Sequence, residues 1–423
     1  MKMKVIVKHW PFFRFYYRMN SRLRVLEVNM DSGVLLLHSL LNSSEEFLNQ
    51  SKNYLDELSN CIKNNSLHLV NEEEFKEQEI KFIFVTSGGT SKIFQKVTES
   101  MDGPFFFITT QTDNSLAAAL EMLSYSNEMG IKGEIIHGNI ESCAKRMEEI
   151  INIFSLKTKL KHTRLGVIGY PDLIASAIKP EVLKTHYGAS LITITMEEFF
   201  KEIDKFTYED NKYTLELKEK SFDLAETEKA LCIYGAVRRL VDKYNLQGVA
   251  VRCFDLLKPY NNTGCLALAI LNAQGIYAAC EADSRSLFSM FIVGELSKKP
   301  VFMANPSVID TDKCEMVLAH CVLPLTMPKS YKLTTHFESG IGVAVKGELE
   351  KTTYTLFKCW EDGRYFVQLG DLLENLNQMD LCRTQVRLKI EDCKAYLTSP
   401  LSNHQMMVEG DYKSLVNEFF SFC

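Results

Sequence analysis

Two polar side chains follow consecutive apolar, strand-like segments in the second half of the sequence. Glu281 comes directly after IYAAC and Asn305 directly after VFMA, with a helix-like segment between them. In an open parallel sheet, ligands bind beyond the carboxyl ends of the strands. If the two strands are neighbours about 4.8 Å apart, both side chains can reach one metal ion or one pair of sugar hydroxyls. The pattern therefore favours a small-molecule site at this sheet edge.

The second of these side chains is an amide, which limits its chemistry. An asparagine oxygen can bind a metal, but it carries no charge and accepts no proton near neutral pH. Pro306 follows Asn305, so we expect the strand to stop there, and a turn-capping asparagine is the alternative interpretation. For Glu281 the alternative is a carboxylate that stabilises the start of the next helix. Asp283 could supply a second carboxylate only if a turn begins at Ala282.

Five further residues are candidates for the same site. His320 ends the apolar run MVLAH, and His404 lies in the polar segment SNHQMMVEGD, where a surface histidine is the alternative. Arg252 ends the strand-like GVAVR and could contact a sugar or phosphate oxygen. His336 and Glu338 alternate along THFESG, so both face one cleft or both face solvent if this segment is a strand.

The elements that must position these residues alternate between strand and helix patterns. Buried strand-like runs such as KFIFV and PFFFIT are followed by helix-like segments such as NSLAAALEMLSYSNEMG. The basic stretch KTKLKHT at 157–163 is typical of a linker, and the alternation restarts after it. This rhythm predicts two doubly wound, Rossmann-like parallel-sheet α/β domains, at 1–158 and 159–324.

The pattern changes near residue 325. Short strand-like runs such as GVAVKGEL, RYFVQLGD and TQVRLKIED follow one another, separated by Gly, Asp or Asn. Their spacing predicts a C-terminal antiparallel β domain over 325–423, a sandwich or a small barrel. The final segment KSLVNEFFSF has a helical pattern and is expected to dock on that domain.

Composition restricts the class of partner and the compartment. The 423 residues are 46% hydrophobic and 24% charged, and the net charge of -6 argues against nucleic acid as the main partner. No apolar run reaches the length of a membrane span. The 12 cysteines form no CxxC pair, which favours free thiols in a reducing cytoplasm. The first 24 residues carry seven Lys or Arg and no acid, and we expect an irregular or interface-forming terminus, with targeting or nucleic-acid contact as alternatives.

Several segments together resemble the family of L-fucose isomerase and L-arabinose isomerase, and most closely its short fucose-isomerase-like branch. The resemblance extends over most of the chain from about residue 80 and is clearest over 245–345. The segments that carry it are VRCFDLL, NTGCLALAILNAQGI, AACEADSRSLFSM, PVFMANPS, VLAHC, YKLTTHFESGIGV and NHQMMVEGDY. It implies a metal-dependent aldose–ketose isomerase that acts on a pentose or 6-deoxyhexose through an enediol, with Mn²⁺ or another divalent cation. It also implies a homo-oligomer, trimer or hexamer, with sites between subunits.

The resemblance assigns roles to individual residues. Glu281 in ACEAD matches the metal-binding and acid/base glutamate, and His404 in NHQMMVEGDY matches the C-terminal histidine ligand. Asn305 in FMANP stands where the family has its second carboxylate. His320 in VLAHC matches the histidine that the arabinose enzymes place after that second acid. Ala282 stands where we expect a glycine between the two acids.

Two main functions are therefore open at the level of sequence, and a carbohydrate enzyme with another reaction on the same scaffold is a third possibility. The first is the isomerase, with Glu281 and Asn305 as catalytic residues and with Glu281, Asn305 and His404 as metal ligands. His320, Arg252, His336 and Glu338 would then contact the sugar. The second is a non-catalytic sugar-binding or regulatory descendant of the family, because Asn305 replaces the second carboxylate.

Overall fold

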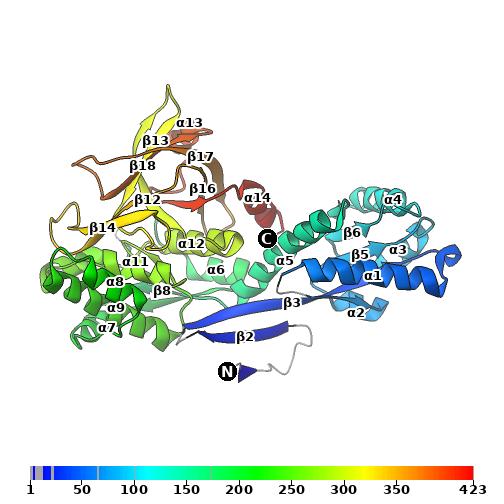
Figure 1. The fold of residues 1–423 in the computed structure, drawn as a ribbon, viewed down its shortest axis with the longest axis horizontal. Helices are drawn as coiled ribbons and strands as arrows, with labels where there is room; N and C mark the ends of the chain where they lie inside the picture. The colour runs from blue at the N-terminus through cyan, green and yellow to red at the C-terminus, as the bar shows by residue number, and fades with distance from the viewer. Residues whose placement is uncertain are drawn as a thin grey trace. The chain divides into compact units, whose positions relative to one another are not determined.

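The computed structural model describes most of the chain, and Figure 1 shows its elements. The chain divides into two compact units, Met1–Lys159 and Leu160–Cys423. The described residues are 3–4, 13–20, 23–63, 66–99, 101–171 and 173–422. No helix within these ranges combines the length and the apolar character that a bilayer crossing requires.

The first unit is built on a seven-stranded sheet with the order β1-β2-β3-β5-β6-β7, in which β4 also pairs with β3. The β1, β2 and β3 strands pair antiparallel, whereas β3 to β7 pair parallel. The strands are β1 Met3–Lys4, β2 Phe13–Asn20, β3 Leu23–Leu37, β4 Ser66–Val70, β5 Lys81–Val85, β6 Phe105–Thr109 and β7 Gly133–Ile136. The helices are η1 Leu40–Asn42, α1 Glu45–Cys61, α2 Glu72–Glu77, α3 Ser91–Thr98, α4 Ser115–Glu128 and α5 Ile140–Lys161.

The core of this unit follows from its continuous apolar strands. Every residue of β5 and β6 is buried, as expected for parallel strands covered on both faces. Phe94 of α3 packs edge-on against Phe105 and Phe107 of β6, with ring centroids 5.5 and 5.3 Å apart. In the basic N-terminal segment, β2 is a strand and not irregular, while 1–2, 5–12 and 21–22 lie outside the described residues.

The basic segment 157–163, expected to be a linker, contains the boundary between the two units and is mostly helical. Helix α5 continues through it to Lys161. The physical reason is that Leu156, Thr158 and Leu160 are buried, so this segment packs on one side instead of facing solvent throughout. The Thr158 hydroxyl also donates to the Glu79 carboxylate at 2.8 Å.

The second unit begins with a four-stranded parallel sheet of order β11-β10-β8-β9. Its strands are β8 Arg164–Ile168, β9 Ser190–Ile194, β10 Gly248–Val251 and β11 Tyr277–Ala279. The helices of this layer are α6 Pro180–Tyr187, α7 Met196–Ile203, α8 Lys212–Glu219, α9 Leu224–Tyr244, η2 Cys253–Leu256, α10 Leu257–Tyr260, α11 Cys265–Ala273 and α12 Ser284–Ser297. Helix α12 is buried along nearly its whole length, because it contacts the parallel sheet through β8, β10 and β11 and the following barrel through β16 and β19.

The rest of the second unit is a closed antiparallel barrel with the strand order β12-β13-β18-β17-β16-β19 (Figure 1). Its strands are β12 Phe302–Asp310, β13 Glu315–His320, β16 Thr353–Cys359, β17 Tyr365–Asn375, β18 Thr384–Ile390 and β19 Gln405–Glu409. A separate hairpin pairs β14 Ser330–Thr334 with β15 Ala344–Glu348. The last helices are α13 Cys393–Thr398 and α14 Lys413–Ser421. The expected fold class, parallel-sheet α/β domains followed by an antiparallel β domain with a terminal helix, is confirmed.

The strand that carries Asn305 differs from the expectation. It is β12 of the barrel and pairs antiparallel with β13 and β19, so it is not a parallel neighbour of β11. It does not stop at Pro306 but runs to Asp310, with a register shift between Pro306 and Val308. Such an irregularity accommodates the missing N–H of proline. The antiparallel barrel therefore begins at Phe302, and β12 and β13 precede the expected boundary at 325.

Candidate functional site

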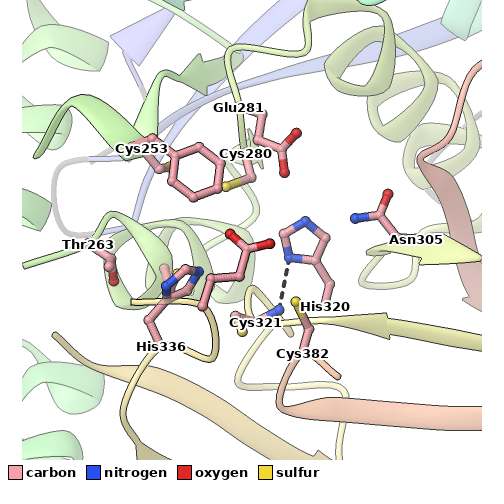
Figure 2. A pocket seen from close by; sticks show the side chains of 12 residues that line it. Cys253, Thr263, Cys280, Glu281, Asn305, His320, Cys321, His336 and Cys382 are labelled. Atoms are coloured by element: carbon pink, nitrogen blue, oxygen red, sulfur yellow. Dashed lines mark hydrogen bonds between the residues drawn. The ribbon is translucent and has the colours of Figure 1, made fainter. Parts of the chain in front are cut away.

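A partly open cavity, with about 450 Å³ of empty space when the part open to solvent is included, lies in the second unit between the carboxyl end of the parallel sheet and the barrel (Figure 2). Glu281, just beyond β11, lines it from the sheet side. Asn305 of β12 and His320 at the end of β13 line it from the barrel side. His336 and Glu338 line it from the connection between β14 and β15, which is a loop and not the expected strand.

The turn after β11 directs Glu281 into the cavity. Glu281 and Ala282 both have left-handed backbone conformations, with φ values of 58° and 50°. This conformation is costly for residues with a Cβ and clusters at functional sites. The Ala282 amide donates to the Val251 carbonyl at 2.9 Å, which ties the turn to the end of β10. The positive φ of Ala282 explains why a glycine would suit this position.

The same turn places Asp283 behind the cavity as the N-cap of α12. Its carboxylate accepts hydrogen bonds from the Ser286 amide at 2.8 Å and the Ser286 hydroxyl at 2.6 Å. The Lys358 ammonium lies 3.6 Å from Oδ2, and both side chains are fully buried. Burial raises the pKa of Asp283, but Lys358 and His404 outweigh this effect and hold it well below its usual range. Asp283 is therefore an anion that supports the site from behind.

His404 is oriented by Asp283. Its Nδ1 lies 2.8 Å from Asp283 Oδ2, and the ring is fully buried. Its Nε2 has no hydrogen-bond partner among the described residues and lies 3.6 Å from Glu281 Oε1. Burial lowers the pKa of His404, but Asp283 and Glu281 outweigh burial and raise it. A histidine held by a carboxylate with its other nitrogen open is the usual arrangement of a metal-binding imidazole.

His320 lies beside His404, with ring centroids 5.5 Å apart and planes tilted by 41°. Its Nδ1 accepts a hydrogen bond from the Cys321 amide at 2.8 Å. Its Nε2 is buried and has no partner among the described residues. Burial, and then the neighbouring His404, lower the pKa of His320 to about 3, so this ring is neutral across the physiological range.

Asn305 is half-buried and faces the cavity with its amide nitrogen directed toward His320 (Figure 2). Its Oδ1 accepts a hydrogen bond from the Asn403 side chain at 2.9 Å. In this orientation the amide offers N–H groups, rather than its oxygen, to a ligand. The metal-ligand role of Asn305 stays a prediction.

The other sequence candidates divide into two groups. His336 and Glu338 line the cavity, and the His336 ring hydrogen-bonds to the Ser339 hydroxyl at 3.0 Å. Burial, and then the charge of Arg383, lower the pKa of His336. Arg252 is not among the described residues that line the cavity; its Nε lies 3.0 Å from the Asp255 carboxylate.

Several functional neighbours could not be recognised from sequence. Lys358 lies in a strand 75 positions after Asp283, and nothing in its local pattern marks it as buried beside a carboxylate. The contact of Asp283 with the Ser286 backbone amide is foreseeable, because an N-cap aspartate commonly accepts a hydrogen bond from the amide three residues later. Five cysteines also line the cavity, although their spacing carries no motif; they are Cys253, Cys265, Cys280, Cys321 and Cys382.

One of these neighbours, Cys280, widens the choice of cation ligands. Donor atoms of Cys280, Glu281 and His320 all lie within 4.8 Å of one another. The open Nε2 of His404 lies 3.6 Å from Glu281 Oε1. A carboxylate oxygen and an imidazole nitrogen suit a divalent cation such as Mn²⁺. The described residues therefore fit a divalent metal at Glu281 and His404.

No family model matches the chain. Two curated proteins, sulfoquinovose isomerases of Priestia aryabhattai and Priestia megaterium (strain ATCC 12872 / QMB1551), are each 26% identical to it over 257 residues. The match covers 56% of this chain and 58% of each relative. A sulfoquinovose isomerase of Clostridium sp. (strain MSTE9) is 25% identical over 173 residues, or 38% of each chain.

The named relatives are sugar isomerases. The chain spans somewhat more than half the length of the two Priestia proteins that it matches. This similarity supports the sugar-isomerase part of the expected family and does not single out L-fucose isomerase or L-arabinose isomerase.

Proposed function

We propose that this protein is a metal-dependent aldose–ketose isomerase. The observation that carries the proposal is the open, buried Nε2 of His404, held by Asp283 and placed 3.6 Å from the Glu281 carboxylate. The similarity to proteins named sugar isomerases supports it independently. Mn²⁺ or another divalent cation is the proposed cofactor, held by Glu281 and His404. Asn305, the third ligand expected from the sequence, could join them only after its oxygen leaves the Asn403 side chain.

Glu281 is the proposed proton shuttle. A bound divalent cation would polarise the carbonyl and hydroxyl oxygens of the open-chain sugar. The Glu281 carboxylate then takes the proton from C2 of the aldose and leaves an enediolate, a proton passes from O2 to O1, and the carboxylate returns its proton to C1 to give the ketose. Burial raises the pKa of Glu281, but His404 and His320 outweigh burial and lower it overall. The group is therefore an unprotonated base at neutral pH, as this step requires.

The proposed substrate is an uncharged pentose or 6-deoxyhexose. The relatives are named for sulfoquinovose, whose sulfonate is an anion. Proteins bind such anions with Arg or Lys donors. None of the described residues that line the cavity is an arginine or a lysine, whereas Glu281 and Glu338 are acidic. This lining favours neutral hydroxyl groups over a sulfonate.

The setting of the enzyme is also a proposal. All eleven cysteines in the described residues have free thiols, which supports a reducing, cytoplasmic compartment. A homo-oligomer, trimer or hexamer, is proposed from the family resemblance alone.

A non-catalytic sugar-binding protein is the second candidate function. The observation that favours it is Asn305, a neutral amide whose oxygen is already engaged by Asn403 at 2.9 Å. Such a protein would bind a sugar in the same cavity without exchanging its C2 proton.

Proton exchange in D₂O separates these functions. Wild type, Glu281→Gln and Asn305→Asp are incubated with Mn²⁺ and with pentoses, 6-deoxyhexoses or sulfoquinovose, and deuterium at C2 is measured by NMR. Exchange by wild type that chelator and Glu281→Gln both abolish supports the isomerase. No exchange by wild type with any sugar, together with measurable sugar binding, would favour the non-catalytic candidate. Exchange that appears only in Asn305→Asp would show an intact scaffold whose chemistry the asparagine has switched off.

A further inference from the structure

His404 and His320, the two histidines beside Glu281, differ in the partner of their Nδ1 atom: one partner accepts a hydrogen bond and the other donates one. His404 Nδ1 lies 2.8 Å from the Asp283 carboxylate, which only accepts hydrogen bonds. His320 Nδ1 lies 2.8 Å from the Cys321 backbone N–H, which only donates. Because a neutral imidazole carries one proton, that proton is on Nδ1 in His404 and on Nε2 in His320.

The open nitrogens of the two rings therefore differ in chemistry. Both Nε2 atoms are buried and have no hydrogen-bond partner among the described residues. In neutral His404 this atom has a lone pair, which can bind a cation. In His320 it has an N–H, which can bind an oxygen. A ring nitrogen of His320 lies within 4.8 Å of a Glu281 carboxylate oxygen. Figure 2 shows the nitrogen that is not bonded to Cys321 on the Glu281 side of the ring, so this N–H is directed toward the proposed reaction site.

The tautomer of His320 is fixed by the fold. The Cys321 amide follows His320 directly at the end of β13, and the His320 side chain is only 5% exposed. Moving the proton to Nδ1 would set two N–H groups against each other at 2.8 Å and break a buried hydrogen bond. Ligation of a metal through Nε2 would require this change.

We propose that His320 is a catalytic hydrogen-bond donor, whose neutral imidazole presents Nε2–H to the substrate oxygen that becomes negative in the enediolate, and that His320 is not a metal ligand. This inference rests on the proposed isomerase function. A preorganised donor aimed at developing charge typically contributes about 10²–10³ in kcat. The proposal separates the two histidines into one ligand and one donor.

The tautomer itself can be tested without any variant. We expect ¹⁵N–¹H correlation spectra of the metal-free wild type at pH 8 to show His320 protonated at Nε2 and unprotonated at Nδ1. Spectra of His320→Gln assign the signal by its absence. A His320 ring protonated at Nδ1 would overturn the proposal.

The variants His320→Leu, His320→Gln and His404→Gln test the roles. We expect His320→Leu to lower kcat about 10²–10³-fold, and to bind Mn²⁺ within about threefold of wild type because it removes no ligand. His320→Gln retains an N–H and should recover part of the loss. His404→Gln should weaken Mn²⁺ binding by at least about 10–100-fold. Thermal unfolding confirms that each variant is folded before it is compared.

Two results would contradict the proposal. If His320→Leu loses Mn²⁺ affinity as strongly as His404→Gln, His320 is a ligand. If His320→Leu retains wild-type kcat, the donor role is wrong. Failure of the isomerase proposal gives a different result. The wild type then exchanges no sugar proton, and the catalytic role of His320 is wrong as well. The ¹⁵N–¹H spectra and the Mn²⁺ titrations still decide whether His320 is a ligand.

Discussion

Two buried charged clusters connect the start of α12 to the barrel, and one of them approaches a residue that lines the cavity, Glu281. The structural cluster consists of Arg285, Trp360 and Glu361, and the site cluster consists of Asp283, Ser286, Lys358 and His404. In the structural cluster, Arg285 Nε and Nη2 each donate to Glu361 at 2.8 Å. The Arg285 guanidinium also stacks on the Trp360 ring at 3.8 Å.

The clusters differ in unused hydrogen-bonding capacity. The Glu361 carboxylate accepts two hydrogen bonds from Arg285 and a third from the Lys179 backbone amide at 3.1 Å. The negative charge of Glu361 is thereby paired with the positive charge of Arg285. The site cluster is just as buried, but it ends at His404 Nε2, which has no partner among the described residues. The difference teaches that buried charge alone does not mark a site. A better mark is an open polar atom that a charged neighbour has oriented beside a cavity-lining residue, as His404 Nε2 is beside Glu281.

The largest effect is expected from a substitution that breaks the structural cluster. Glu361→Gln leaves the Arg285 charge buried without an anion, and we expect it to lower the free energy of unfolding by about 3–5 kcal/mol. The matched control is Glu197→Gln, which breaks an exposed pair with Lys201 and should leave the free energy of unfolding nearly unchanged. Urea unfolding measures both. Sugar proton exchange per folded molecule should not change in Glu361→Gln, and a specific loss there would show that this cluster also serves the site.

Removing the charge from the site cluster should affect the proposed metal site most. In Asp283→Asn the His404 ring loses its anionic acceptor, and we expect Mn²⁺ affinity to fall by about 10–100-fold. Isothermal titration calorimetry measures the affinity. Ser286→Ala is the control, because it removes one hydrogen bond to Asp283 and leaves the His404 contact intact. Equal Mn²⁺ affinities in wild type and Asp283→Asn would contradict the orienting role of Asp283.

The pH dependence of stability sharpens the comparison further. Burial raises the pKa of Glu361, but Arg285 outweighs burial and lowers it below the ordinary 4.5. A carboxyl group with a lowered pKa in the folded state stabilises the fold above its unfolded-state pKa, and this contribution is lost as the pH falls through the folded-state value. The free energy of unfolding of the wild type should therefore fall more steeply below about pH 4.5 than that of Glu361→Gln, by up to about 1.4 kcal/mol for each pH unit. Parallel acid-unfolding curves would show that the Glu361 contribution is not electrostatic.

The smallest expected effect concerns the turn that leads into the site cluster. Ala282 has a φ of 50°, so Ala282→Gly removes left-handed strain and should stabilise the protein by up to about 1 kcal/mol. Ala279→Gly in β11 is the control and should destabilise by about 0.5–1 kcal/mol, because a strand gains nothing from glycine. Differential scanning calorimetry distinguishes the two, and a loss of stability in Ala282→Gly would show that burial of its methyl group outweighs the strain.

The sequence alone determined the architecture and part of the site. Apolar runs that alternate with helical patterns specify parallel α/β layers, and closely spaced strands with polar breaks specify an antiparallel domain, because these periodicities are local. The position of Glu281 directly after a buried strand was also sufficient to place it at a ligand-binding edge.

The tertiary structure decided everything that depends on distant partners. Whether 302–310 joins the parallel sheet or the barrel is set by pairing with β19, about a hundred residues later, and no local pattern contains that choice. His404 meets Asp283 across 121 positions, and this contact defines which of its nitrogens is open. The protonated nitrogen of a histidine is set by what lies beside the ring in space. For that reason two histidines that look alike in sequence can differ in function here.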